Sequence, residues 1–310
     1  MTPEVVVLAA EVEAALARGH PVVALETAIT THGLPRPANL ETALALERAV
    51  RDAGAVPATI AVLDGQVRVG LRESELERLA TAAHPRKTST RDLARAVADG
   101  AIGGTTVAAT IHVARRCGIR FAATGGIGGV HRGGELSLDV SADLFELARS
   151  PVTVVCSGPK AILDLARTLE MLESLGVTVV GFGTTDLPGF YVARTGLRIP
   201  AVADEAGFVR LWRAHLALGE PTSLVVTQPP PADLALEADE FARLLEAALA
   251  EARRSEVAGA EETPFLLAFL ARATAGRTVR LNIALATANA RLAARLAVAC
   301  AAGSANPPCG

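Results

Sequence analysis

Short apolar runs alternate along this chain with longer stretches in which apolar side chains recur every three or four residues. The short runs are typical of buried strands, and the longer stretches are typical of amphipathic helices. The strands are predicted at 21–29, 119–124 and 152–157 and at VTVVGFG and SLVVTQP, and the helices near 73–81, 90–99, 105–117, 141–149, 205–218, 236–254, 263–275 and 280–302. This alternation predicts an α/β fold with a mixed, largely parallel sheet covered on both faces.

Individual residues set several of the predicted boundaries. Asn39 is predicted to cap the helix NLETALALERAVRDAG, which Gly54 then closes at the position after its last turn. Asp64-Gly65 predicts a two-residue hairpin between two strands within 57–71. Pro159 is predicted to open a long helix through PKAILDLARTLEMLESLG, because proline is common at the first helical position.

No internal repeat, long linker or break in composition divides the chain. We therefore expect a single domain spanning residues 1–310, with a frayed tail at 303–310.

Composition narrows the class of protein. The chain is 50% hydrophobic and 20% charged, as in globular proteins, and its net charge of −3 argues against a nucleic-acid partner. No apolar run approaches the roughly 20 residues that span a bilayer, and the N-terminus lacks the features of a signal peptide. The four cysteines have no metal-ligand spacing. We expect a cytoplasmic protein with reduced thiols and no membrane partner.

Lysine is almost absent. Of the 30 basic residues only Lys87 and Lys160 are lysines, and the rest are arginines. Arginine cannot replace lysine where an amine must lose its proton and act as a nucleophile. Both lysines are thus candidates for function, although chance survival of the two is the alternative.

Glu26 stands at the end of the first predicted strand, in ALETAITTHGLPRP. A carboxylate in an apolar strand loses hydration, which raises its pKa and suits it to donate a proton. An ion pair with a nearby arginine such as Arg36 explains Glu26 equally well.

The two lysines suit different tasks. Lys87 lies among hydroxyl side chains and between Arg86 and Arg91, a set of donors that suits a phosphate, although a solvated basic turn has the same pattern. Lys160 is predicted in the first turn of a helix, where the helix dipole and partial burial favour the neutral amine. A neutral amine attacks a carbonyl carbon to form a Schiff base, so Lys160 is the preferred nucleophile.

The loop TGGIGGVHRGG, residues 124–134, allows the backbone to approach an anion or another ligand closely. It is not a dinucleotide fingerprint, because His131 stands where the third glycine belongs, and neither lysine follows a glycine as in a P-loop. Asp139 and Asp143 follow, and two acids four residues apart can hold a divalent ion. A helix cap plus a surface acid is the alternative.

Several segments together resemble the pseudouridine-5'-phosphate glycosidase family, also called indigoidine synthase A-like. The segments are ALETAITTHGLPRPANLETA, GAVPATIAVLDGQVRVGL, RKTSTRDL, GGTTVAATIHVA, FAATGGIGGVHRGGELSLDVSADLFELAR, VTVVCSGPKAILDLARTLEMLESLGV and EETPFLLAFLARATAGRTVRLNIALATANARLA. The resemblance covers nearly the whole chain in order and is weakest at about 184–260 and at both termini.

The resemblance implies a three-layer α/β/α sandwich that assembles as a homotrimer. It implies reversible cleavage of pseudouridine 5'-phosphate with water to uracil and ribose 5-phosphate, with one Mn²⁺ per subunit. The site residues it implies are Glu26 as proton donor, Lys160 as nucleophile, Asp139 as manganese ligand, Lys87, Val107, Ser141, Ala142 and Asp143 as substrate contacts, and His131 and Asn282 as contacts to uracil or ribose.

The chain departs from the family pattern at a few positions. Thr27 replaces the usual serine after the glutamate, and Pro159 replaces the usual alanine before the nucleophilic lysine. Asn289 stands where two adjacent asparagines are more usual, which leaves the contacts to uracil open.

The chemistry accounts for this set of residues. A carbon–carbon glycosidic bond has no basic leaving atom, so acid catalysis through an oxocarbenium ion suits it poorly. Opening the sugar and forming an imine at C1 permits a retro-aldol-like break once the uracil carbon is protonated. The alternatives are an N-glycosidase with two carboxylates, a Schiff-base phosphosugar aldolase or isomerase, and a non-catalytic phosphosugar-binding protein.

Overall fold

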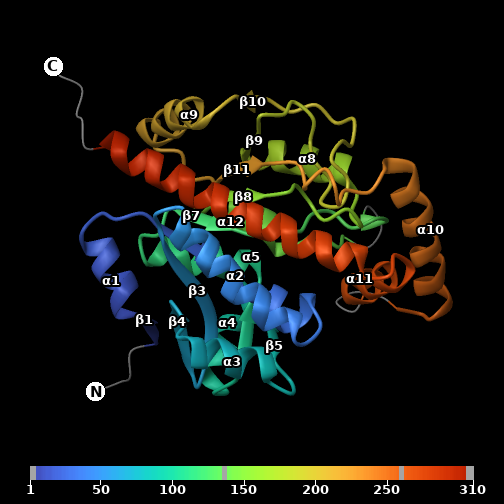
Figure 1. Ribbon diagram of the computed structural model, residues 1–310, viewed down its shortest axis with the longest axis horizontal. Helices are drawn as coiled ribbons and strands as arrows, with labels where there is room; N and C mark the ends of the chain where they lie inside the picture. The colour runs from blue at the N-terminus through green and yellow to red at the C-terminus, as the bar shows by residue number, and fades with distance from the viewer. Residues whose placement is uncertain (1–4, 135–137, 258–261, 305–310) are drawn as a thin grey trace.

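A large, mostly parallel sheet forms the centre of the computed structural model, which describes residues 5–134, 138–257 and 262–304 (Figure 1). Its main strand order within these residues is β1-β4-β3-β2-β7-β8-β11-β9-β10, with β6 and β5 continuing from β3. Only the pairings of β3 with β4 and with β6 are antiparallel. The strands are β1 (Val6–Leu8), β2 (Val22–Leu25), β3 (Val56–Leu63), β4 (Gln66–Val69), β5 (Arg86–Thr88), β6 (Gly103–Thr105), β7 (Phe121–Ala123), β8 (Thr153–Cys156), β9 (Thr178–Phe182), β10 (Ala201–Val202) and β11 (Leu224–Thr227).

Helices cover both faces of this sheet. Successive residues of β2, β7 and β8 belong to two different apolar clusters, so each strand is buried on both sides. The helices are α1 (Ala10–Ala17), α2 (Ala38–Asp52), α3 (Glu73–Thr81), α4 (Leu93–Ala98), α5 (Val107–Arg116), α7 (Ala142–Leu147), α8 (Leu165–Ser174), α9 (Glu205–Ala217), α10 (Ala238–Arg254), α11 (Glu262–Ala273) and α12 (Arg277–Ser304), with short turns η1 (Ile29–Gly33) and η2 (Thr90–Asp92). The predicted α/β class and largely parallel sheet are confirmed.

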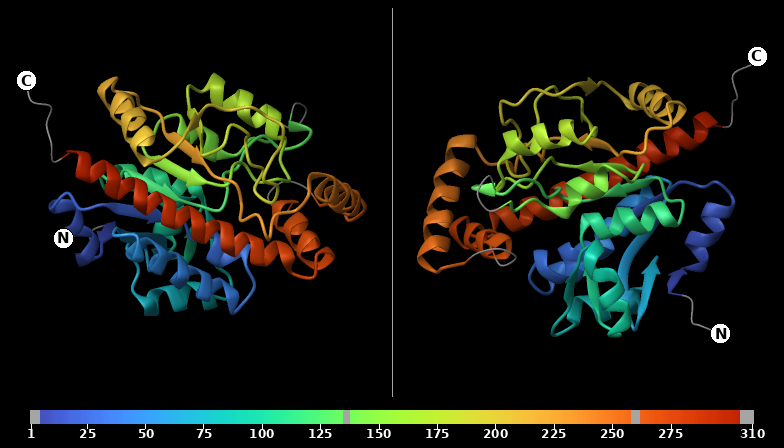
Figure 2. Two further views of the ribbon diagram at one scale, coloured as in Figure 1. Left: turned by 45° about the horizontal axis from the view of Figure 1, so that its top comes forward. Right: turned by 180° about the vertical axis from the view of Figure 1, so that it is seen from behind.

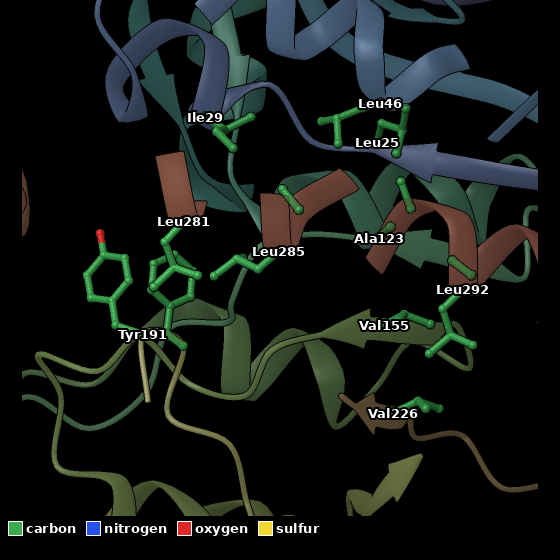
Figure 3. Close-up of a cluster of buried hydrophobic side chains, with 14 of the residues drawn as sticks. Leu25, Ile29, Leu46, Ala123, Val155, Tyr191, Val226, Leu281, Leu285 and Leu292 are labelled. Carbon is green, nitrogen blue, oxygen red and sulfur yellow. The ribbon is translucent and has the colours of Figure 1, made fainter. Parts of the chain in front are cut away.

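The long helix α12 crosses one face of the sheet beside α2 (Figure 1). Figure 3 shows its Leu285 and Leu292 in the same buried cluster as Ala123, Val155 and Val226 of three neighbouring strands. By length and apolar composition α12 is a candidate for crossing a membrane, which the search for apolar runs missed, but 56% of its most apolar window is buried inside the protein. Its packing is that of a core helix.

Helices α10 and α11 form a pair at one end of the molecule, away from the two chain termini (Figures 1 and 2). Helix α11 also contacts α12 and the turn η1. The pair thereby brings residues from late in the chain to the carboxyl ends of early strands. Of the predicted frayed tail, helix α12 includes residues 303 and 304, and residues 305–310 lie outside the described part.

The hairpin prediction is confirmed, and the predicted helix cap is wrong. Strands β3 and β4 pair around Asp64 and Gly65, whose positive φ angles of 52° and 77° suit a tight turn. Helix α2 begins at Ala38, one residue before the predicted cap. Asn39 lies inside the helix and donates to the carbonyl oxygens of Thr30 and Ala80, so a tertiary contact uses its side chain instead.

Two other boundaries also differ from the prediction. Strand β2 ends at Leu25 rather than continuing to residue 29, because the chain turns into η1. No helix opens at Pro159, since α8 begins only at Leu165, where the Asp164 side chain accepts from the Arg167 amide at 3.1 Å. The consequence for Lys160 is described below.

Candidate active site

One cleft lies at the carboxyl ends of β2, β7 and β8, where open parallel sheets bind ligands. It collects side chains from the chain just after each strand, from the β5 strand and from helices α11 and α12. Its lining residues are Glu26, Ala28, Ile29, His32, Gly33, Lys87, Thr124, Gly125, Gly126, Lys160, Phe190, Thr263, Pro264, Leu267 and Asn282. Four of the residues predicted from the sequence meet here: Glu26, Lys87, Lys160 and Asn282.

Glu26 directly follows β2 and its carboxylate is fixed by two donors. The Ile29 amide donates to Oε2 at 2.9 Å, and the Thr124 hydroxyl donates to Oε1 at 3.2 Å. Burial raises the pKa of the Glu26 carboxyl, and the Ile29 amide, the Lys160 charge and the Thr124 hydroxyl offset this only in part. Such a carboxyl retains its proton to higher pH than an ordinary glutamate, as a proton donor requires.

The alternative reading of Glu26 as the partner of Arg36 is wrong. The Arg36 guanidinium donates to the backbone oxygens of Ala80 at 3.0 Å and Ala82 at 2.7 Å, at the end of α3. The cation therefore satisfies helix carbonyls. Glu26 instead shares the cleft with Lys160.

Thr27 holds the chain beside Glu26. It is fully buried, and its hydroxyl donates to the Ile60 oxygen at 2.6 Å while accepting from the Thr105 amide at 2.9 Å. These contacts tie the end of β2 to β3 and β6. Threonine at this position thus supplies a hydroxyl, as the more usual serine does.

Lys160 lies in an irregular segment and not in a helix, so the predicted effect of the helix dipole is wrong. Its amide donates to the Ile127 oxygen at 3.0 Å, and the Ile127 amide donates to the Gly158 oxygen at 3.2 Å. These two bonds form a parallel bridge centred on Pro159, which has no N–H to leave unsatisfied. The proline therefore fits the bridge, and Lys160 enters the cleft from a strand-like segment.

Lys87 lies in strand β5 and not in a turn. The side chains next to it do not point into the cleft. Side chains alternate along a strand, so Arg86 and Thr88 point away from the side on which Lys87 lines the cleft. Arg86 pairs with Asp99 at 2.6 Å, and the Arg91 side chain is 89% exposed. The predicted group of donors around a phosphate is therefore wrong, and Lys87 is its only member at the cleft.

The glycine loop packs closely against its surroundings. A side chain at Gly126 would lie 2.5 Å from the Phe190 ring, and one at Gly128 would lie 2.1 Å from the Ser141 hydroxyl. The amides of Gly128 and Val130 donate to the side chains of Asp143 and Thr168. These amides are therefore not available to an anion, and of this loop only Thr124, Gly125 and Gly126 line the cleft.

Asp143 braces this loop. It is 5% exposed, and its two oxygens accept from the amides of Ala108 and Gly128, both at 2.8 Å. Because both Asp143 oxygens accept backbone amides, its surroundings favour the alternative of a structural acid near a helix start, and the predicted pairing with Asp139 around a metal ion stays a prediction. Ser141 caps α7 by accepting from the Asp143 amide at 3.2 Å.

The remaining predicted substrate contacts lie outside the residues that line the cleft. Val107 is buried at the start of α5, and Ala142 is exposed at the start of α7. His131 lies with its Nδ1 3.9 Å from an Asp139 oxygen. The structure therefore places these residues around the glycine loop.

The fit of the chain to a divalent ion rests on Asp139. Its carboxylate is 41% exposed and lies beside His131. Within the described part of the chain, no three His, Cys, Asp or Glu side chains converge on one point. Such surroundings fit an ion that keeps most of its water and takes one or two protein ligands, a common mode for Mg²⁺-like ions.

Asn282, on α12, is a polar residue of the cleft whose side chain can still form hydrogen bonds. It is 7% exposed, lines the cleft, and its carboxamide makes no hydrogen bond to any residue that the structure describes. The carboxamide faces the cleft, where it can bind a ligand that supplies both a donor and an acceptor.

Sequence reasoning missed several residues of the cleft, among them His32, Phe190 and Thr263. His32 lies in the quoted THGLP segment, and its Nδ1 lies 2.7 Å from the Thr31 hydroxyl. Phe190 has a φ of 58°, which no local signal predicts, and falls where the family resemblance is weakest. Thr263 reaches the cleft only because α11 packs beside η1.

Known proteins share this sequence over almost its whole length. The family described as indigoidine synthase A like protein matches residues 11–299. The pseudouridine-5'-phosphate glycosidase of Herpetosiphon aurantiacus is 50% identical over 294 residues, which cover 94% of this chain and 97% of the relative. That of Methylobacterium nodulans is 52% identical over 292 residues, which cover 94% of this chain and 87% of the relative.

Solved structures agree. The prealnumycin C-glycosynthase AlnA, in complex with ribulose 5-phosphate, superposes with a TM-score of 0.90 at 37% identity, covering 97% of this chain and 99% of its own. An indigoidine synthase A-like protein from Thermotoga maritima gives 0.86 at 37% identity, with coverage of 95% and 96%. Sequence and fold therefore agree that this chain belongs to the indigoidine synthase A-like family, in which the pseudouridine-5'-phosphate glycosidases are found.

Proposed function

We propose that this chain is a pseudouridine-5'-phosphate glycosidase, which cleaves the C–C bond between uracil and ribose 5-phosphate. The observation that carries this is the presence of Lys160 and the Glu26 carboxyl, whose pKa is raised, in a single cleft. The relatives that share about half of their residues with this chain carry the glycosidase name, whereas the related C-glycosynthase shares 37%.

In the cleavage direction, the Lys160 amine attacks C1 of the ribose, and the bond from C1 to the ring oxygen breaks as that oxygen takes up a proton. Glu26 then donates its proton to the uracil carbon. The nitrogen lone pair forms the C1–N double bond as the C–C bond breaks, and the electron pair of that bond returns to the uracil ring. Water hydrolyses the imine, which releases ribose 5-phosphate and restores the amine.

Two residues are suited to bind the two ends of the substrate, which are the phosphate and the uracil. Lys87 brings a compact positive charge to the cleft and suits the phosphate. Asn282 offers a donor and an acceptor together, which match the carbonyl and N–H edge of uracil. The bound ribulose 5-phosphate of the C-glycosynthase supports a phosphosugar as the class of ligand.

Asp139, with His131 beside it, would hold a divalent ion such as Mn²⁺. When bound, the ion supplies positive charge that polarises oxygen atoms of the substrate or of water. The single exposed carboxylate supports a loosely held, exchangeable ion.

The assembly and compartment belong to the same proposal. We infer one domain over residues 1–310 that forms a homotrimer in the cytoplasm, supported by the family membership and by relatives of nearly equal length. Light scattering on the purified chain tests the homotrimer directly.

The central experiment follows uracil released from pseudouridine 5'-phosphate by the purified chain. Borohydride reduction in the presence of ribose 5-phosphate should add the mass of a reduced pentose phosphate at Lys160. The Lys160→Arg variant should lose both signals and keep its melting temperature, because arginine retains the charge but forms no imine.

The same experiment separates the alternatives. A tenth of wild-type turnover in Lys160→Arg would rule out covalent catalysis at this residue. Trapping without uracil release would favour a phosphosugar aldolase or isomerase, and binding without either signal would favour a non-catalytic phosphosugar-binding protein.

A further inference from the structure

Asn289, on α12, makes a dense set of hydrogen bonds just outside the cleft. It is fully buried, and its Nδ2 donates to the Thr124 oxygen at 2.8 Å and the Gly125 oxygen at 3.3 Å. Nδ2 also lies 3.2 Å from the Ser157 hydroxyl, and Oδ1 accepts from the Gln228 side chain at 2.8 Å. Asn289 does not line the cleft, so it has a task other than contacting substrate.

The partners of Asn289 mark the ends of three adjacent strands. Thr124, Ser157 and Gln228 are the first residues after β7, β8 and β11. Backbone hydrogen bonds of 2.9 or 3.0 Å still link these residues to the neighbouring strands, and the Thr124 carbonyl accepts from Asn289. One carboxamide from the covering helix therefore adds a side-chain link between the three strand ends.

Thr124 connects this arrangement to the chemistry. Its backbone oxygen accepts from Asn289, and its hydroxyl donates to Glu26 at 3.2 Å. We propose that Asn289 is a positioning residue, which holds Thr124 so that the threonine hydroxyl orients the Glu26 carboxyl toward the bond to be cleaved. This inference rests on the proposed role of Glu26 as proton donor.

The arrangement has a consequence for pH dependence. The charged groups that act on Glu26 are Lys160 and Asp143, and Lys87 and His32 also line its cleft. Burial raises the pKa of Glu26, and the hydrogen bonds from the Ile29 amide and the Thr124 hydroxyl both lower it. If Thr124 shifts, this pKa rises, and the high-pH limb of the kcat profile, where the donor loses its proton, moves to higher pH.

Three variants test the inference. Asn289→Ala should lower kcat by about 10- to 100-fold with little change in KM, since displacement of a catalytic group by about 1 Å has effects of this size. Gln228→Met removes only the bond to the Asn289 oxygen and should give a smaller loss. Thr124→Val removes the hydroxyl itself.

All three variants should shift the high-pH limb upward. The double variant Asn289→Ala, Thr124→Val should shift it no further than Thr124→Val alone, because both act through one hydroxyl. Ser223→Ala is the matched control. It deletes a buried bond to the Ser150 oxygen at the other end of β11, so it should lower the melting temperature and leave the pH profile unchanged.

The inference is overturned if Asn289→Ala and Gln228→Met behave like the control, with lower melting temperatures and an unshifted high-pH limb. Glu26→Gln distinguishes this from failure of the proposed function. If Glu26→Gln keeps its turnover, Glu26 is not the proton donor and the proposed mechanism fails as well. If Glu26→Gln is inactive while the Asn289 variants leave the limb unshifted, only the positioning role is wrong.

Discussion

Two carboxylates lie near the ends of the central strands and are held in opposite ways. Asp143 binds one backbone amide with each oxygen, both at 2.8 Å. Glu26 has one backbone amide and one longer bond from a hydroxyl, and burial raises its pKa. Asp143 joins the start of α5 to the glycine loop, whereas Glu26 lines the cleft beside Lys160.

The difference separates an acid that stabilises the fold from one that is suited to donate a proton. A carboxylate whose two oxygens accept buried backbone amides ties two parts of the fold together. Glu26 also has two donors, but one is a hydroxyl at 3.2 Å, and burial raises its pKa in spite of them. Burial alone therefore does not identify the proton donor, whereas the position of Glu26 in the cleft and its raised pKa together support that role.

The largest effect is expected for Glu26→Gln. Removal of a general acid should lower kcat by about 10²- to 10⁴-fold, while the amide fills the same space. Steady-state release of uracil measures the loss. Turnover within tenfold of wild type would assign proton donation to another group.

The same variant should be more stable than wild type near neutral pH. A glutamate with a raised pKa in the folded state favours folding below its unfolded pKa of about 4.3, and this contribution is lost as the pH rises through the folded value. Glutamine carries no such dependence. The gain in melting temperature should therefore be present at pH 7 to 8 and absent below about pH 4, and an equal gain at both would contradict the raised pKa.

The next effect concerns Lys87, the second lysine of the cleft. Lys87→Ala should cost about 2–4 kcal/mol of transition-state stabilisation on pseudouridine 5'-phosphate, as expected for loss of one partner of a charge pair. The ratio kcat/KM measures it. Pseudouridine without phosphate should already be a poor substrate and become little worse, while equal loss on both substrates would place Lys87 at the sugar ring.

A smaller effect is expected for Asp143→Asn, the counterpart of Glu26→Gln. The asparagine side chain would place its NH₂ group, which cannot accept a hydrogen bond, opposite one of the two backbone amides. We therefore expect a loss of about 1–3 kcal/mol in the free energy of unfolding. Urea unfolding measures this loss. A raised KM with unchanged stability would instead support the substrate contact that the family resemblance implies for Asp143.

The smallest effect is expected for Asp139→Asn, at an exposed carboxylate outside both environments. The variant should need more Mn²⁺ for half-maximal activity and reach a similar maximum, because one charge is lost and the shape is kept. A titration of activity against added Mn²⁺ after chelation measures this. Wild-type activity that survives chelation and ignores added Mn²⁺ would exclude a metal at this residue.

Local sequence signals predicted the features that depend on neighbouring residues. The Asp64-Gly65 hairpin, the end of α2 at Gly54 and most helices are examples, because backbone conformation and amphipathic periodicity are encoded within a few residues. The same reasoning failed at Pro159 and Asn39. There, a bridge to the glycine loop and contacts to Thr30 and Ala80 replace the helix start and the cap.

The sequence by itself determined the α/β class, the identity of the two rare lysines and the acid at a strand end. Only the tertiary structure decided which neighbours accompany them. Strand alternation carries Arg86 away from Lys87, Arg36 binds the end of α3, and α12 brings Asn282 and Asn289 to strands more than a hundred residues earlier. Residue types specify the chemistry that is available, but long-range packing sets the distances, burial and hydrogen bonds on which pKa values and reactivity depend.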